Sequence, residues 1–179
     1  MTEQLVPTGG QTIGPFFGFA LPFACGEHLV PPGHPDAVEL TGLVLDGAGQ
    51  PVPDALVEVW QPGAEGNVVQ LAGSLRRSPH AFTGWGRCPT DAVGRYSFTT
   101  VRPGAPTSFF ALTVFARGLT NRLFTRAYLP GSSDALLSSL PEDRRATLLV
   151  TEKAGTLIFD IRLQGDHETV FLRYPGHHA

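Results

Sequence analysis

The sequence lacks three features that mark common classes of protein: a long apolar run, a cluster of basic residues and a dense set of cysteines. No apolar run approaches the roughly 20 residues that a membrane-spanning helix needs. The net charge is −3 and no segment is polybasic, so a surface that could neutralise nucleic-acid phosphates is missing. Two cysteines, Cys25 and Cys88, are too few for a disulfide scaffold, and they favour two buried thiols over one bridge. We therefore expect neither a membrane nor a nucleic acid as a partner.

Charge is also scarce. Charged residues make up 16% of the chain, which excludes a long helical rod, and apolar residues make up 42%, which excludes a disordered chain. Residues 1–4 lack the positive start and apolar core of a signal peptide, so we expect a cytoplasmic protein. A chain of 179 residues suits one domain with a buried core. We expect that domain to span 1–179, with an arm over 1–37 and a core over 38–179.

Glycine and proline, at 21 and 16 residues, separate short β-branched runs, which is typical of short strands joined by turns. Within residues 55–61, Ala55, Val57 and Val59 occupy every second position, the period of a strand. Further strands are expected at 38–45, 95–101, 109–116, 123–128, 148–151, 156–163 and 169–172, with a loop at 62–90. A helix is expected at 132–140, ended by Pro141. We predict an all-β fold: an antiparallel β-sandwich with a long irregular N-terminal arm and one short helix.

The arm, residues 1–37, combines six prolines with four phenylalanines. The prolines exclude a regular sheet or a long helix from this segment. A segment so apolar must lie against its own core or against another chain. Both alternatives stay open at this point.

Segments at the start of the core, 41–47 and 51–61, resemble a hairpin shared by transthyretin-like domains, surface-adhesin repeats and intradiol ring-cleavage dioxygenases. The motifs that follow are more specific to the dioxygenases: Gly86-Arg87-Cys88-Pro89-Thr90-Asp91, Gly94-Arg95-Tyr96-Ser97-Phe98 and Val101-Arg102-Pro103-Gly104. Three more motifs resemble the iron-free alpha subunits within that family: Gln11-Thr12-Ile13-Gly14-Pro15-Phe16-Phe17, Val114-Phe115-Ala116-Arg117-Gly118-Leu119 and Phe159-Asp160-Ile161-Arg162-Leu163-Gln164-Gly165. The resemblance therefore covers almost the whole chain.

The resemblance implies an enzyme that cleaves 3,4-dihydroxybenzoate with O2 between its hydroxyl-bearing carbons, using Fe(III) held by two tyrosinates and two histidines. The matching positions carry other residues. Counting back from Cys88 puts Ser74 near the first tyrosine, Ala105 and Pro106 follow the Pro-Gly turn, and the His-x-His pair falls on Phe109-Phe110-Ala111. We therefore expect this chain to bind no metal. A homologous beta subunit would carry the Fe(III), with alpha–beta pairs assembled into a larger oligomer.

The resemblance also implies that such a chain lines a shared substrate pocket. Arg126 matches the residue that would bind the substrate carboxylate, and a guanidinium suits that role because it holds both oxygens and stays charged. Thr12, Gly14, Pro15 and Phe16 match a wall of the pocket, although Phe16 lacks the hydroxyl of the tyrosine common at that position. The alternatives are a surface arginine at 126 and simple packing of the arm.

Two other functions compete with an enzyme subunit. The hairpin at 41–61 also suits a non-enzymatic interaction module of the transthyretin-like or adhesin-repeat type, but the chain shows no tandem repetition. A self-sufficient catechol dioxygenase conflicts with the missing iron ligands. We favour an alpha subunit without catalytic residues or metal of its own.

Overall fold

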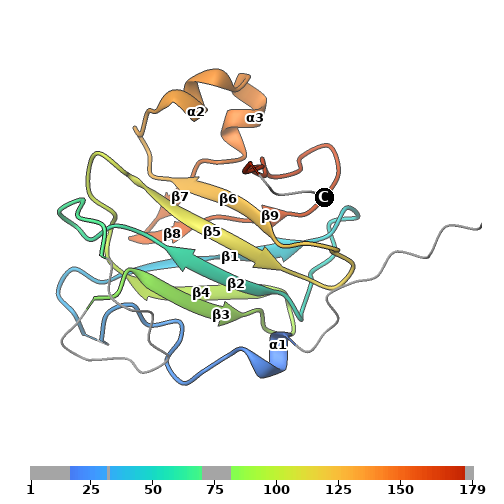
Figure 1. Cartoon of the computed structure of the whole chain (residues 1–179), viewed down its shortest axis with the longest axis horizontal. Coiled ribbons are helices and arrows are strands. Elements are labelled where there is room, and N and C mark those ends of the chain that lie inside the picture. Colours follow the sequence, from blue (N-terminus) through green and yellow to red (C-terminus); the bar gives the residue numbers. More distant parts are fainter. Residues whose placement is uncertain (1–16, 32, 70–81, 176–179) are drawn as a thin grey trace, which may run out of the picture.

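The computed structural model describes residues 17–175 except Pro32 and residues 70–81. Its strands form two layers packed face to face (Figure 1). One sheet has the order β4-β1-β8-β7, with β9 also beside β1, and the other has the order β3-β2-β5-β6. The strands are β1 (Val38–Leu45), β2 (Leu56–Trp60), β3 (Trp85–Pro89), β4 (Arg95–Thr100), β5 (Phe109–Phe115), β6 (Leu123–Tyr128), β7 (Thr151–Lys153), β8 (Thr156–Ile158) and β9 (Ile161–Arg162). The predicted all-β sandwich is confirmed.

Alternating side chains make the core between the layers. In β5, Phe110, Leu112 and Val114 are buried, whereas the residues between them are partly exposed. From the facing sheet, Tyr96 and Phe98 are fully buried. Because successive strand residues point to opposite faces, the odd-numbered residues of β5 lie on the outer face of its sheet.

The sheets differ from the prediction in two ways. β1 pairs in parallel with β8 and β9, so the sandwich is not purely antiparallel. β3 lies inside the segment expected to be a loop. Gly86 obscures its pattern, and glycine is required there because a Cβ would lie 2.5 Å from the Leu29 side chain. Of the strands expected at 148–151 and 169–172, the structure has the isolated bridges Tyr128–Leu149 and Phe124–Leu172, and β7 begins at Thr151.

The prediction of one helix is also wrong, because the described residues contain three: α1 (Phe17–Ala20), α2 (Ala135–Ser139) and α3 (Glu142–Ala146). Pro141 ends α2 as expected, but it also precedes the first turn of α3. That turn carries two acidic residues and the last turn two arginines, as the helix dipole favours. α2 and α3 lie together beyond β6, at one end of the sandwich (Figure 1). No described helix has the length and apolar character needed to cross a membrane.

The described part of the arm packs on the chain's own core. Phe17 is buried against Phe115, with ring centroids 6.2 Å apart, and Phe23 stacks on Trp85 at 5.6 Å. Phe19, by contrast, is 84% exposed. The described part of the arm therefore lies against the chain's own core, and it also exposes the apolar side chain of Phe19 to solvent.

Neither cysteine is in a disulfide. Cys88 is buried as predicted, and burial raises the pKa of its thiol to about 11. Cys25 is exposed, so the prediction of two buried thiols is wrong for this residue. It lies in a tight turn of the arm with a positive φ of 59°, which leaves its side chain outside the core.

A seam in the first sheet joins the C-terminal strands to β1. β8 and β9 both pair in parallel with β1. The two residues between them, Phe159 and Asp160, lie beside Gly42. The Phe159 carbonyl accepts a hydrogen bond of 2.6 Å from the buried Tyr96 hydroxyl. The Asp160 carboxylate accepts one of 2.9 Å from the Leu43 amide. A Cβ on residue 42 would lie 1.9 Å from the Phe159 carbonyl oxygen, so only glycine fits.

Candidate functional site

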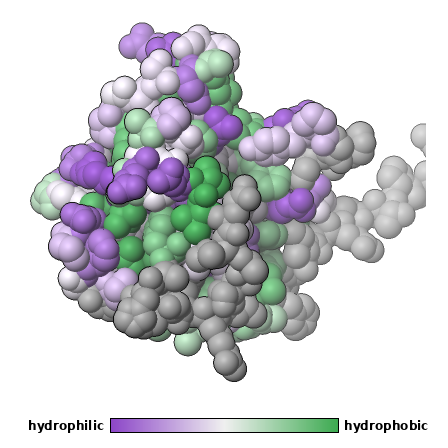
Figure 2. Space-filling model, turned by 60° about the vertical axis from the view of Figure 1, so that its left-hand side comes forward, coloured by the Kyte–Doolittle hydropathy of each residue, from purple (hydrophilic) through white to green (hydrophobic). Residues whose placement is uncertain are grey.

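The candidate site lies on the outer face of the β3-β2-β5-β6 sheet. Register places Trp60 opposite Ala111, and Ala111 opposite Arg126, so these three residues form one row across three strands. Trp60 is 45% exposed, and the small Ala111 leaves space between the indole and the guanidinium. β2 ends at the left side of the molecule in Figure 1. Figure 2 turns this side forward and shows apolar side chains gathered between hydrophilic ones.

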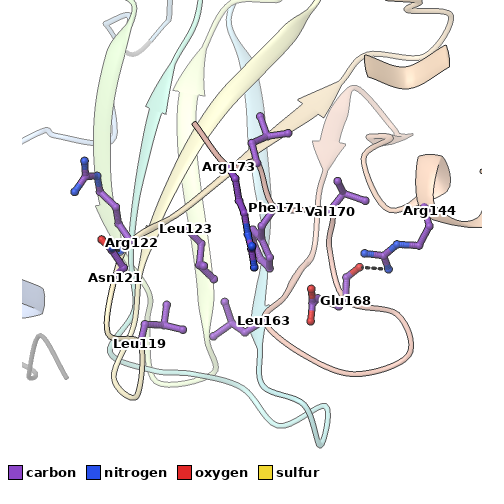
Figure 3. A pocket seen from close by; sticks show the side chains of 11 residues that line it. Leu119, Asn121, Arg122, Leu123, Arg144, Leu163, Glu168, Val170, Phe171 and Arg173 are labelled. Carbon is purple, nitrogen blue, oxygen red and sulfur yellow. Dashed lines mark hydrogen bonds between the residues drawn. The ribbon is translucent and has the colours of Figure 1, made fainter. Parts of the chain in front are cut away.

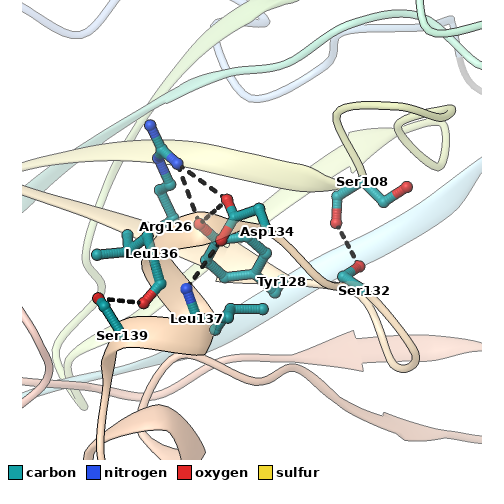
Figure 4. Close-up of polar contacts among 8 residues, drawn as sticks. All are labelled: Ser108, Arg126, Tyr128, Ser132, Asp134, Leu136, Leu137 and Ser139. Atoms are coloured by element: carbon teal, nitrogen blue, oxygen red, sulfur yellow. Dashed lines mark hydrogen bonds and ion pairs between the residues drawn. The ribbon is translucent and has the colours of Figure 1, made fainter.

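Arg126 is held at this face by two polar neighbours, drawn in Figure 4, and by the aromatic ring of Phe109. Its Nη1 donates to the Tyr128 hydroxyl at 3.0 Å and lies 3.3 Å from Oδ2 of Asp134. The Tyr128 hydroxyl donates to the same Oδ2 at 2.7 Å. The guanidinium carbon lies 4.3 Å from the centroid of the Phe109 ring. Nε and Nη2 have no hydrogen-bond partner among the described residues, so one edge of the guanidinium fork stays available to a carboxylate.

Local sequence explains this arrangement. Arg126 and Tyr128 are two residues apart on β6 and share one face of the strand. Asp134 is the N-cap of α2, and its Oδ1 accepts from the Leu137 amide at 2.8 Å. A single carboxylate therefore caps a helix with one oxygen and binds the Arg126–Tyr128 pair with the other.

The charges in this cluster reinforce one another. Burial acts to raise the pKa of Asp134, but hydrogen bonds from the Leu137 amide and Tyr128, together with the charge of Arg126, lower that pKa below its ordinary value. Burial, aided by Asp134, raises the pKa of Tyr128 to about 12 although Arg126 opposes the shift. Tyr128 therefore remains a neutral hydroxyl donor at working pH. Burial acts to lower the pKa of Arg126, but Tyr128 and Asp134 raise it overall.

Replacement of Asp134 by asparagine is expected to remove a pH-dependent part of the stability. Because the folded pKa of Asp134 lies below its ordinary value of 3.8, the carboxylate stabilises the fold above about pH 4, and this contribution is lost as the pH falls through the folded pKa. Asparagine keeps the shape and the capping oxygen but carries no charge. In urea unfolding, Asp134→Asn should be less stable than the unmodified protein at pH 7, and the difference should narrow below about pH 4. A difference that stays constant across this range would contradict the assignment.

A cavity of about 460 Å³ adjoins the cluster. Tyr128, Asp134 and Phe109 line it together with the loops 106–108 and 131–133. The two loops are joined by a hydrogen bond of 3.0 Å from the Ser132 hydroxyl to the Ser108 carbonyl. The cavity gives this face room for a small molecule beside the Arg126 cluster.

The described residues do not supply the donors that Fe(III) would need. They contain no group of three or more histidine, cysteine, aspartate or glutamate side chains that could hold a metal ion. Phe109 and Ala111, at the positions expected for the His-x-His pair, offer no donor atoms. The Tyr96 hydroxyl is buried on the Phe159 carbonyl, and that of Tyr128 is bound to Asp134. Ser74 lies outside the described residues.

The structure tests only part of the predicted pocket. Arg126 lies on an outer face with Asp134 as a close ionic partner, and its predicted role in binding a carboxylate stays a prediction. Thr12, Gly14, Pro15 and Phe16 lie outside the described residues. The sequence analysis did not single out Tyr128 or Asp134. The same-face spacing of Arg126 and Tyr128, with a capping aspartate shortly after the strand, is the signal that could have found both.

Comparisons with known proteins agree with this geometry. A family model described as "Dioxygenase" matches residues 14–109. The chain is 34% identical to the alpha chain of protocatechuate 3,4-dioxygenase from Burkholderia cepacia, over 93% of this chain and 97% of that one. It is 33% identical to the beta chain from the same organism, over 94% of this chain and 81% of that one. It is also 32% identical to the alpha chain from Pseudomonas putida, over 96% and 98%.

Solved structures show the same fold. The dioxygenase domain of a carbohydrate-binding fusion protein from Streptomyces sp. SirexAA-E matches with a TM-score of 0.57 at 23% identity, over 89% of this chain and 99% of that one. Catechol 1,2-dioxygenase from Acinetobacter sp. ADP1 matches with a TM-score of 0.55 at 19% identity, over 75% and 55%. The chain therefore belongs to the intradiol ring-cleavage dioxygenases, a family of oxidoreductases.

Proposed function

We propose that this chain is the iron-free alpha subunit of a protocatechuate 3,4-dioxygenase. In this proposal a homologous beta chain holds Fe(III), and the alpha chain shapes a shared pocket for 3,4-dihydroxybenzoate. The assembled enzyme converts this substrate and O2 to 3-carboxy-cis,cis-muconate in the cytoplasm, as a step of the beta-ketoadipate pathway of aromatic catabolism. Thr12, Gly14, Pro15 and Phe16 are proposed as a wall of that pocket. Alpha–beta pairs assemble into a larger oligomer.

One observation carries the assignment to an iron-free subunit. At the positions where the family resemblance places two histidine ligands, β5 carries Phe109 and Ala111, and the Arg126 guanidinium lies 4.3 Å from the Phe109 ring centroid. A fixed positive charge at this point opposes a metal cation. Sequence identity alone does not separate the two subunit types, because the alpha and beta chains match almost equally, at 34% and 33%.

The Arg126 cluster supports the role of a carboxylate receptor. Tyr128 and Asp134 bind Nη1 of Arg126. The other edge of the guanidinium, formed by Nε and Nη2, is left for a carboxylate that accepts two hydrogen bonds. Asp134 offsets part of the guanidinium charge, so binding at this edge depends on the two directed hydrogen bonds as well as on charge. The exposed Phe19 and Trp60, at 84% and 45%, provide apolar surface for a partner subunit.

The first test compares the chain alone with the chain co-expressed with an iron-bearing beta chain. We expect no stoichiometric iron and no ring cleavage from the chain alone, because Phe109 and Ala111 stand where ligands are required. The purified complex should hold iron and consume O2 with 3,4-dihydroxybenzoate. Metal analysis and oxygen uptake measure both properties. Full activity from the isolated chain would refute the proposal, and failure of the two chains to associate would favour a non-enzymatic interaction module.

A further inference from the structure

A second cavity, of about 390 Å³, has none of Arg126, Tyr128 and Asp134 in its lining, which Figure 3 shows. It opens between the start of β6, the residue after β9 and the C-terminal segment 168–173. Its apolar lining includes four side chains that pack against the main core: Leu119, Leu123, Leu163 and Phe171. The cavity is therefore an apolar recess at the edge of the sandwich.

Three arginines line this recess with one carboxylate. Arg144 and Arg173 contribute two positive charges beside Glu168, whereas the Arg122 guanidinium lies 5.1 Å from the centroid of the Phe124 ring and points away from the recess (Figure 3). None of the three forms an ion pair with a carboxylate of the described residues, whereas Arg87, Arg102, Arg117 and Arg126 each do. Arg144 donates instead to the backbone carbonyl of Glu168 at 2.8 Å. With Glu168 as its one carboxylate, the lining of the recess still carries a net positive charge.

The recess is separate from the Arg126 cluster. Leu123 pairs with the buried Val114 and points between the sheets, whereas Arg126 pairs with Ala111 on the outer face. A ligand that contacts Leu123 in the recess therefore lies on the opposite face of β6 from one bound to Arg126. The two locations can be tested independently.

We propose that this recess binds a small organic anion with an apolar body, of the aromatic carboxylate class. Its volume suits a ring-sized molecule, the leucines and Phe171 accept the apolar part, and the arginines attract the carboxylate. An inorganic anion would leave the apolar lining unused. The inference depends only on residues of this chain and does not require the proposed dioxygenase function.

The probe is 4-fluorobenzoate. Fluorine NMR measures its binding to the full chain and, where a complex forms, to the complex. The neutral 4-fluorobenzamide is the matched control ligand. We expect saturable binding of the benzoate at concentrations of about 10 mM or below, and at least about tenfold weaker binding of the benzamide. Arg173→Gln and Arg144→Gln should each weaken benzoate binding to the recess by about tenfold, whereas Arg102→Gln, at a partly exposed arginine that does not line the recess, should change it less than about twofold. Arg173 is exposed, so its substitution is not expected to disturb folding.

Four results would overturn the proposal. Equal binding of the benzoate and the benzamide would remove the role of the arginines. Loss of binding in Arg126→Gln, with Arg173→Gln unaffected, would place the ligand at the other site. Displacement of the benzoate by an equal concentration of inorganic phosphate would show that the recess is a simple anion site. Loss of benzoate binding in the complex would show that a partner subunit covers the recess.

Discussion

Arg126→Ala in the assembled enzyme is expected to raise KM for 3,4-dihydroxybenzoate by about 100-fold while kcat changes little. Loss of a charge-assisted pair of hydrogen bonds corresponds to roughly 1.5–3 kcal/mol, and the substrate carboxylate stays bound throughout the reaction. The substitution therefore removes binding that is equal in the ground state and the transition state, which raises KM alone. Steady-state oxygen uptake measures both constants.

Catechol lacks the carboxylate. Its turnover therefore distinguishes a loss of carboxylate recognition from general damage to the pocket. If Arg126 binds the carboxylate, turnover of catechol should change less than about threefold in the same variant. Iron content of the complex should also stay constant, because Arg126 contributes no ligand. Equal losses with both substrates would show that Arg126 supports the structure of the pocket and does not recognise the substituent.

Gly42→Ala is expected to lower the free energy of unfolding by at least about 3 kcal/mol, because no backbone rearrangement in the seam can accept a Cβ without breaking contacts. The new methyl group would lie 1.9 Å from the Phe159 carbonyl oxygen, and this carbonyl is the acceptor for the buried Tyr96 hydroxyl. Displacement of Phe159 would leave that hydroxyl without its partner inside the core, which adds its own cost. Urea unfolding followed by tryptophan fluorescence measures the change.

Gly18→Ala provides the matched control. Gly18 lies in α1, and the nearest atom to a Cβ there is the Asp54 carbonyl oxygen at 3.4 Å, an ordinary contact. Alanine also favours a helix over glycine, so the stability of this variant should stay within about 1 kcal/mol of the original. Similar losses in the two variants would mean that the Gly42 seam has no special role.

The strands that could be predicted from sequence are those with turn-forming residues directly before and after them. β1 and β6 have the predicted bounds because turn-forming or polar residues flank an apolar run on each side. The pairing of Glu39 with Thr156 in a parallel ladder could not be predicted, since it depends on contacts between distant segments. β3 was missed for the same reason: its Gly86 is explained by Gly26 and Leu29 of the arm, which pack over it.

The candidate site divides in a similar way. Arg126 could be predicted because a family motif and the chemistry of guanidinium point to the same residue. Its partner Asp134 could not, because the chain must first turn after β6 and begin α2 before the carboxylate returns to the strand. The cavity beside it likewise joins loops that are far apart in sequence.

The double use of Asp134 makes the amide proton of Leu137 a reporter on the arginine. Oδ1 protects that amide while Oδ2 holds Arg126 and Tyr128, so the helix start and the guanidinium share one side-chain orientation. Rotation of Asp134 would expose the Leu137 amide to solvent exchange and would release Arg126 at the same time. Hydrogen–deuterium exchange at this single amide would therefore record how often Asp134 leaves the orientation in which it holds Arg126, without any substrate present.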